Sequence, residues 1–317
     1  MPNTMPQQIQ FSDHHHWQFG WGKGLYNFHE QQQPLWVTFG PCRHEPKPLD
    51  VEIATAVKRI ANNTTRPIYV AMSGGIDSEL IARMMIQERI PFKPVIVQFE
   101  EDYNKQDIAY AFEFCKDQQL SPEIIKLDIL QFFKTCRKTP YILTNCAHLM
   151  QMHIMRHVHQ LGGMTVIGVG EQRYKNVEGK IVVPVPQERI AVTHFMQAEQ
   201  IEGVSAFYCY TPELMLSLLR EAKEIGFEDI EKFAHNIKEA IYQKFWPDLK
   251  PRPKFSGFEK IGKKRLMVQT RLRKILLKKY GRTVFSNVQI SVDSLEHQLV
   301  HGSEKNKSEK TKFAISN

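Results

Sequence analysis

The sequence predicts an α/β protein built on a parallel sheet with helices on both of its faces. Three observations lead to this fold class. Short runs rich in β-branched residues alternate with segments whose apolar residues recur at helical spacing. Two adjacent glycines separate the first of these runs from a helical segment, as at a strand–helix junction. The chain has 317 residues and is 42% hydrophobic, which is enough to bury a sizeable core. Strands and helices that alternate in this way form right-handed βαβ units.

The chain is expected to divide into four parts. Residues 1–48 are polar and aromatic, with short β-like runs such as Leu35–Phe39 between glycines and prolines, so they predict a β-hairpin or small sheet appended to the main domain. The alternating elements occupy 49–205. The segment 206–290 is predominantly helical in pattern and carries a basic helix. The segment 291–317 ends in polar, lysine-rich residues and is expected to be a disordered tail.

Within 49–205, strands and helices follow one another in order. The helical segments are Leu49–Ala61, Ile76–Glu88, Lys105–Gln118 and Asn145–Leu161. The strands are Arg66–Met72, Phe92–Phe99, Pro122–Asp128 and Met164–Gly170. Each is bounded by polar or glycine-containing turns.

The stretch SGGIDS, at 73–78, lies where a strand ends and a helix begins. Open α/β sheets bind ligands at this position, and a helix N-terminus offers N–H groups and partial positive charge to an anion. The two glycines let the backbone approach closely, and the two serines add hydroxyl donors. These four residues predict a phosphate cradle without the Walker lysine. Asp77 would be repelled by phosphates unless a cation intervenes, so we expect Mg²⁺ between them.

SGGIDS resembles the SGGxDS signature of the PP-loop ATP pyrophosphatases. That superfamily includes the synthetase domain of asparagine synthetase, NAD synthetase, GMP synthetase, and enzymes of tRNA lysidine formation, tRNA thiolation and deazaguanine nitrile synthesis. The resemblance implies a five-stranded parallel sheet of adenine-nucleotide hydrolase topology. It also implies that ATP is cleaved between its α- and β-phosphates.

Other stretches resemble asparagine-synthetase-like domains in particular. The strand that ends at 97–99 resembles the second strand of those domains, and the end of that strand supplies backbone contacts to adenine. VIGVGEQRY, at 166–174, falls where that family carries a Gly-Glu-Gly-Ala-Asp-Glu run; Gly170 and Glu171 match it, whereas Gln172 and Arg173 depart from it. Of the contacts that this run usually supplies to pyrophosphate and metal, only that of Glu171 is therefore implied here.

The glutaminase domain of asparagine synthetase has no counterpart in the first 48 residues. Its first mature residue is a cysteine, whereas this chain has Pro2 and its first cysteine is Cys42. We therefore expect free ammonia, an amine, another nucleophile or a separate ammonia source.

The resemblance implies a two-step reaction. An oxygen of a small-molecule carboxylate, an amide or a ring carbonyl attacks the α-phosphorus of ATP, pyrophosphate leaves, and a nucleophile then displaces AMP. Catalytic roles are implied for Asp77, Glu171, Arg173, Lys175 and Lys254, the first two as Mg²⁺ ligands and one of the three basic residues as the group that neutralises the leaving charge. The implied nucleotide-binding residues are Met72, Ser73, Gly74, Gly75, Asp77, Ser78, Val97, Gln98, Phe99 and Gly170.

A basic stretch near the C-terminus leaves two interpretations open. Thirteen Lys or Arg residues and one acid lie between Lys250 and Arg282. The helix expected at Lys263–Tyr280 is either a docked amphipathic helix with a solvated basic face or a contact for nucleic acid such as tRNA. The second interpretation favours modification of a tRNA or nucleobase. A third hypothesis is a non-catalytic nucleotide-binding module, against which the carboxylate of Asp77 argues.

Composition disfavours several other classes of protein. Five scattered cysteines without a CxxC pair disfavour a disulfide framework, a zinc ribbon and an iron–sulfur cluster. No run of about 18 apolar residues is present, so no membrane span is expected. The N-terminus lacks the pattern of a secretory signal. Together these features favour a cytoplasmic protein.

Overall fold

A five-stranded parallel sheet forms the centre of the computed structural model, which describes residues 16–21, 24–25, 35–135, 146–227, 237–250, 252 and 287–302. The strand order is β10-β7-β4-β5-β6, and every neighbouring pair is parallel. The strands are β4 (Ile68–Ala71), β5 (Lys93–Phe99), β6 (Glu123–Leu127), β7 (Met164–Ile167) and β10 (Gly203–Val204). The predicted fold class is confirmed.

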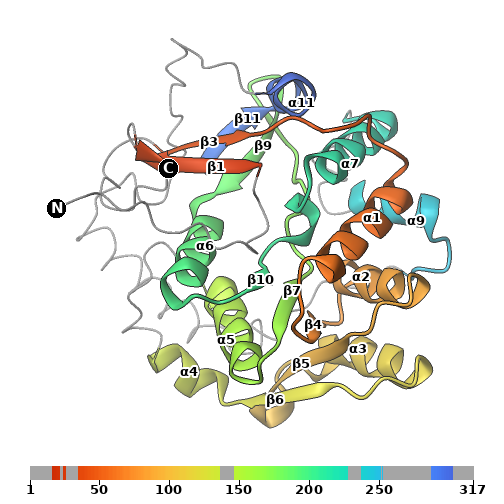
Figure 1. Ribbon diagram of the computed structural model, residues 1–317, viewed down its shortest axis with the longest axis vertical. Helices are drawn as coiled ribbons and strands as arrows, with labels where there is room; N and C mark the ends of the chain where they lie inside the picture. The colour runs from red at the N-terminus through yellow and green to blue at the C-terminus, as the bar shows by residue number, and fades with distance from the viewer. Residues whose placement is uncertain are drawn as a thin grey trace.

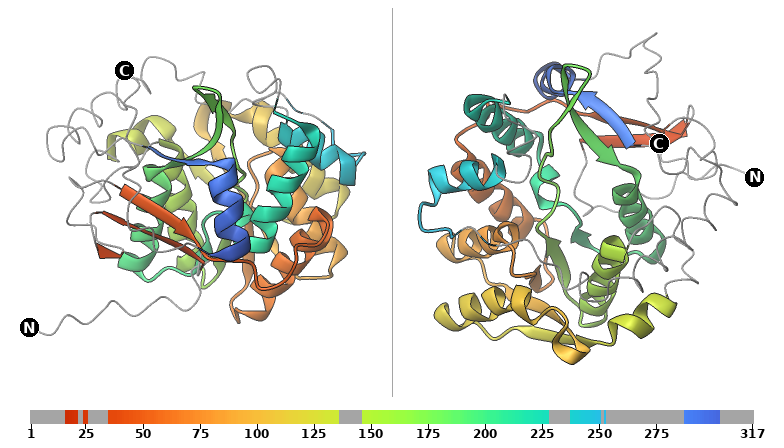
Figure 2. Two further views of the ribbon diagram at one scale, coloured as in Figure 1. Left: turned by 90° about the horizontal axis from the view of Figure 1, so that it is seen from above. Right: turned by 180° about the vertical axis from the view of Figure 1, so that it is seen from behind.

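Helices cover both faces of this sheet (Figures 1 and 2). On one face lie α1 (Leu49–Asn62), α2 (Ile76–Gln87) and α3 (Lys105–Asp117). On the other lie α4 (Ile129–Thr135) and α5 (Cys146–Gln160). The side chains of β4 alternate accordingly: Ile68 and Val70 join the core beneath α1 and α2, whereas Tyr69 packs with the residues of α5. Apolar residues on both faces explain the continuous apolar character of this strand.

The predicted boundaries agree with the structure within one or two residues, except at β7. The sequence predicted a strand up to Gly170, whereas β7 ends at Ile167. Beyond Ile167 the chain leaves the sheet, and Gly170 has φ +107. Gly168 comes so close to α2 that a Cβ there would lie 3.0 Å from the amide nitrogen of Ser78. The loop 168–170 therefore lies against the start of α2.

The strand order creates a switch point beside β4. From β4 the chain moves outward through β5 to β6, then returns to place β7 on the opposite side of β4. The loops after β4 and β7 consequently diverge at the same edge of the sheet, which is where open α/β sheets bind ligands.

The N-terminal segment forms the predicted small sheet. It contains β1 (Trp17–Trp21), β2 (Gly24–Leu25) and β3 (Leu35–Phe39), in the antiparallel order β2-β1-β3. Trp17 and Phe19 are 2% and 1% exposed and belong to the same buried cluster as α1 and α2. The small sheet is thus part of the main core.

A second antiparallel sheet was not predicted. Its order is β11-β9-β8, with β8 (Lys175–Val177), β9 (Lys180–Pro186) and β11 (Asn287–Ser291). The helix α6 (Gln187–Glu199) follows β9, and α7 (Pro212–Ile225) and α9 (Ile237–Phe245) lie in the segment predicted to be helical. The basic stretch Lys263–Tyr280 lies outside the described residues.

The prediction of a disordered tail over 291–317 is wrong for its first part. Helix α11 (Val292–His301) follows β11, and the hydroxyl of Ser291 caps it by accepting from the amide of Ser294. Leu295 and Leu299, four residues apart, are 1% and 0% exposed. These leucines pack against the core, which outweighs the polar composition that suggested disorder.

In the described part of the chain, no helix is both long and apolar enough to cross a membrane.

Candidate active site

The SGGIDS stretch forms the tight loop that follows β4 and the first residues of α2. The hydroxyl of Ser78 donates to the carbonyl of Gly75 at 3.0 Å and accepts from the amide of Ser73 at 3.4 Å. The amide of Gly75 donates to the hydroxyl of Ser73 at 3.3 Å. Gly75 caps α2 without a side-chain hydrogen bond. The first turn of α2 therefore presents its N-terminus at the switch point, as an anion site requires.

The two glycines of the loop have different conformations. Gly74 has φ +87, and a Cβ there would lie 1.9 Å from the carbonyl oxygen of Asp107 at the start of α3. Gly75 has φ −79, and its Cβ would meet only the Ser73 hydroxyl, at 3.4 Å. Only the first position requires glycine for the fold itself.

Asp77 is held by side chains from distant parts of the chain. Its Oδ2 is 2.5 Å from Nζ of Lys238, and its Oδ1 accepts from the hydroxyl of Tyr242 at 3.0 Å. Both partners belong to α9. The hydroxyl of Tyr208 donates to the backbone carbonyl of Asp77 at 3.0 Å. The Asp77 side chain is 17% exposed.

Glu171, from the loop after β7, faces the same ammonium group. Its Oε1 is 3.9 Å from Nζ of Lys238 and 3.5 Å from Nη2 of Arg173. The Glu171 side chain is 10% exposed, whereas that of Arg173 is 59% exposed. The structure thus brings Asp77 and Glu171 to the same ammonium group, that of Lys238.

Burial and charge shift the pKa values of these groups. Burial raises the pKa of Asp77, Glu171 raises it further, and Lys238 opposes both. For Lys238, burial acts to lower the pKa, but the carboxylates of Asp77 and Glu171 outweigh it and the pKa is raised. Lys238 is therefore an ammonium ion at neutral pH. Burial raises the pKa of Tyr208 and Tyr242 well above the usual value, so both remain hydroxyl donors.

A second cation, Arg252, lies at the SGGIDS loop, and it was not among the site residues predicted from the sequence. Its Nη1 donates to the carbonyl of Gly74 at 2.7 Å, and its Nη2 pairs with the carboxylate of Glu79. Its guanidinium carbon lies 4.6 Å from the ring centroid of Tyr110. The side chain is only 12% exposed. In the sequence it was one of many basic residues between 250 and 282, and nothing local marked either it or Lys238.

The end of β5 carries a backbone contact that the sequence did not reveal. The amide of Phe99 donates to Oδ1 of Asn104 at 2.9 Å, and the carbonyl of Val97 accepts from Nδ2 of Asn104 at 2.8 Å. Asn104 is buried and holds these two backbone groups. The adenine contacts expected at 97–99 would have to share the Val97 carbonyl with this side chain.

Four other residues that the sequence predicted to bind nucleotide or to act in catalysis lie in different parts of the chain. Met72 is buried and its amide donates to the carbonyl of Val95 at 2.9 Å. The carbonyl of Gly170 accepts from the thiol of Cys209 at 3.0 Å. Lys175 is exposed at the start of β8. Lys254 lies outside the described residues.

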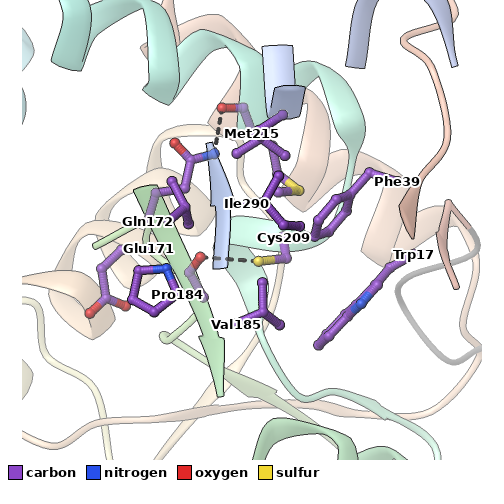
Figure 3. Close-up of a pocket in the computed structure, with 12 residues that line it drawn as sticks. Trp17, Phe39, Glu171, Gln172, Pro184, Val185, Cys209, Met215 and Ile290 are labelled. Atoms are coloured by element: carbon purple, nitrogen blue, oxygen red, sulfur yellow. Dashed lines mark hydrogen bonds between the residues drawn. The ribbon is translucent and has the colours of Figure 1, made fainter. Parts of the chain in front are cut away.

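A small apolar cavity lies beside Glu171 (Figure 3). Glu171 and Gln172 are at one end, and Trp17 and Phe39 are at the other. Its volume of about 20 Å³ has room for a water molecule or two but not for a nucleotide. Gln172 is engaged there: its Nε2 donates to the carbonyl of Met215 at 2.8 Å.

Asp77 and Glu171 fit a divalent cation as two hard oxygen ligands. Among the described residues, no group of three or more His, Cys, Asp or Glu residues could hold a metal by itself. A magnesium ion here would need phosphate oxygens as further ligands, which suits a nucleotide-dependent ion.

No protein-family model matches the chain, and no curated protein matches it. Solved structures that resemble it include an NH3-dependent NAD synthetase from Campylobacter jejuni, with 16% identity, 73% of this chain and 94% of that chain covered, and a TM-score of 0.34. Another is NMN synthetase from Francisella tularensis, with 13% identity, the same coverages of 73% and 94%, and a TM-score of 0.35. At these TM-scores the likenesses carry no argument about activity.

Proposed function

We propose that the chain is an AMP-forming ATP pyrophosphatase of the PP-loop type. It would activate a carboxylate or amide-type oxygen for attack by ammonia or an amine. One observation carries the proposal: at the switch point of a parallel sheet, the SGGIDS loop places Asp77 opposite Glu171, and both carboxylates face one ammonium group.

Pyrophosphate would bind at the N-terminus of α2. The first turn of α2 has backbone N–H groups without partners inside the helix, and the helix dipole favours negative charge there. Arg252 contacts the carbonyl of Gly74 and in this proposal would neutralise charge that develops on the departing group. Arg173 is the more exposed cation near Glu171 and would be available to the acceptor.

The reaction would form one P–O bond and break another. The acceptor oxygen donates an electron pair to the α-phosphorus, and the bond from that phosphorus to the bridging oxygen of the β-phosphate breaks with its electrons. Ammonia or an amine then attacks the adenylated carbon, loses a proton, and displaces AMP. Asp77 and Glu171 would hold Mg²⁺, which neutralises phosphate charge when bound.

Product analysis tests this function. The protein is incubated with Mg²⁺ and α-labelled ATP together with amino acids, ammonia and bulk tRNA. We expect AMP and pyrophosphate, and omission of one component at a time identifies the acceptor. ADP and phosphate, with contaminating enzymes excluded, would refute the proposal.

Two variants make the test specific to the site. Asp77→Asn keeps the shape of the side chain but removes its charge, and we expect at least a 100-fold loss of AMP formation, roughly the effect of removing one preorganised charged group. Asp117→Asn, an exposed carboxylate at the end of α3, is the control and should keep full activity. Dependence on tRNA would favour nucleobase modification. Tight ATP binding without turnover would favour a non-catalytic nucleotide-binding module.

A further inference from the structure

The ammonium of Lys238 occupies the position between the two carboxylates that are the proposed metal ligands. Its Nζ is 2.5 Å from Oδ2 of Asp77 and 3.9 Å from Oε1 of Glu171. The other oxygen of Asp77 accepts from Tyr242. Each oxygen of Asp77 therefore already has a donor within the chain.

A divalent ion and this ammonium cannot share the site without strong repulsion. The Lys238 side chain is 22% exposed and the carboxylates are less exposed, so solvent screens the two positive charges poorly. An ion bound directly to Asp77 would require the ammonium to move away. The phosphate oxygens of a nucleotide are negatively charged, as the carboxylate is, and would offer the displaced ammonium a new partner.

The backbone of Lys238 is well anchored, which makes a side-chain movement sufficient. On α9, Ile237 and Ile241 are 5% and 2% exposed and belong to the main core. Tyr242 is fully buried, with its ring centroid 5.8 Å from that of Tyr208. A lysine has a flexible four-carbon stem, so its ammonium can change partner while the helix remains in place.

We propose that Lys238 is a positioning residue that occupies the metal position until nucleotide binds, so that divalent-ion binding at Asp77 depends on nucleotide. The inference rests on the proposed function, because it takes the SGGIDS loop as the phosphate site. It assigns to Lys238 the task of holding Asp77 and Glu171 in place in the absence of an ion.

Manganese binding to the nucleotide-free protein tests the proposal. Free Mn²⁺ is measured by electron paramagnetic resonance during titration of the wild type and of Lys238→Met. We expect Lys238→Met to bind one Mn²⁺ at least tenfold more tightly than the wild type. The gain should disappear in the double variant Asp77→Asn/Lys238→Met.

A matched control lies on the same helix. Lys244 of α9 pairs with Glu221 and Glu224 and makes no described contact with Asp77. Lys244→Met should bind Mn²⁺ as the wild type does. Equal affinity of Lys238→Met and the wild type, or a gain that survives Asp77→Asn, would overturn the proposal.

If Lys238→Met does not fold, Mn²⁺ titration of the wild type without nucleotide tests the proposal by itself. A one-to-one Mn²⁺ site of micromolar affinity, present without nucleotide and lost in Asp77→Asn, would overturn the proposal. Its absence would support the proposal. The product assay keeps the two proposals separate: AMP formation by the wild type with no gain in Lys238→Met refutes only the role of Lys238. A gain without AMP formation refutes only the proposed reaction.

Discussion

Substituting alanine for each glycine of the loop should have very different effects on stability at the two positions. At Gly74 the new methyl group would lie 1.9 Å from the carbonyl oxygen of Asp107, whereas ordinary contact begins at 3.4 Å. The two atoms must therefore separate by about 1.5 Å. Both are held by backbone, so the adjustment resembles overpacking of a core, which costs about 1–3 kcal/mol. The φ of +87 adds roughly 1–2 kcal/mol for a residue with a Cβ.

Gly74→Ala should therefore lower the free energy of unfolding by about 2–5 kcal/mol. Gly75→Ala meets only the hydroxyl of Ser73, at 3.4 Å, and keeps a φ of −79. There the entropy lost by the unfolded chain favours alanine by about 0.4–1 kcal/mol. The poorer cap opposes this by a similar amount, so the net change should stay within about 1 kcal/mol.

Urea unfolding monitored by circular dichroism measures both changes, without ligand, from the shift in midpoint at constant slope. Equal losses for the two variants, or a loss at Gly74 of less than about 1 kcal/mol, would show that the loop does not pack against α3 as described. Displacement of the loop by an ångström should also reduce ATP cleavage by Gly74→Ala about 100-fold.

Three further predictions concern other parts of the molecule. Arg252→Met should lower the melting temperature and weaken ATP binding more than Arg83→Met. Both arginines pair with the buried Glu79, but Arg252 also contacts the carbonyl of Gly74 and is 12% exposed, whereas Arg83 is 31% exposed. Calorimetry compares the two variants, and equal effects would contradict the contact between Arg252 and Gly74. Leu299→Ala should cost about 2–5 kcal/mol in urea unfolding, because the side chain is fully buried in α11, whereas a disordered tail would show no change. Burial raises the pKa of Cys115 from 9.0 to about 11, so the folded state retains a proton that the unfolded state loses; this contribution to stability is complete below pH 9.0 and is lost as pH rises toward 11. Cys115→Ala should reduce the fall in unfolding free energy over that window, and an unchanged fall would contradict the shift.

Local signals in the sequence were sufficient for much of the fold. The period of the apolar residues fixed the central strands and helices, since β4 and α2 depend on neighbours two to four positions away. The SGGIDS loop was found for the same reason: its glycines, its serines and Asp77 are contiguous. Glu171 was selected only because the stretch 166–174 resembles asparagine-synthetase-like domains, and no periodicity or spacing pointed to it.

Only the tertiary structure revealed which residues complete the site. Lys238 reaches Asp77 across 161 positions of sequence, and Arg252 reaches Gly74 across 178. The sequence could not single them out because a lysine on a helix and an arginine in a basic stretch are ordinary in their local surroundings. Strand β11 was missed for a related reason: its pairing partner, β9, lies about a hundred residues earlier.

The sequence by itself determined the class of fold and the place of the SGGIDS segment between a strand and a helix, because both are encoded in short-range periodicity and in residue types at adjacent positions. The tertiary structure decided the electrostatics of the site. The charge that balances Asp77 and the close approach of Gly74 to Asp107 depend on contacts between segments far apart in the chain. Such contacts leave no local signal.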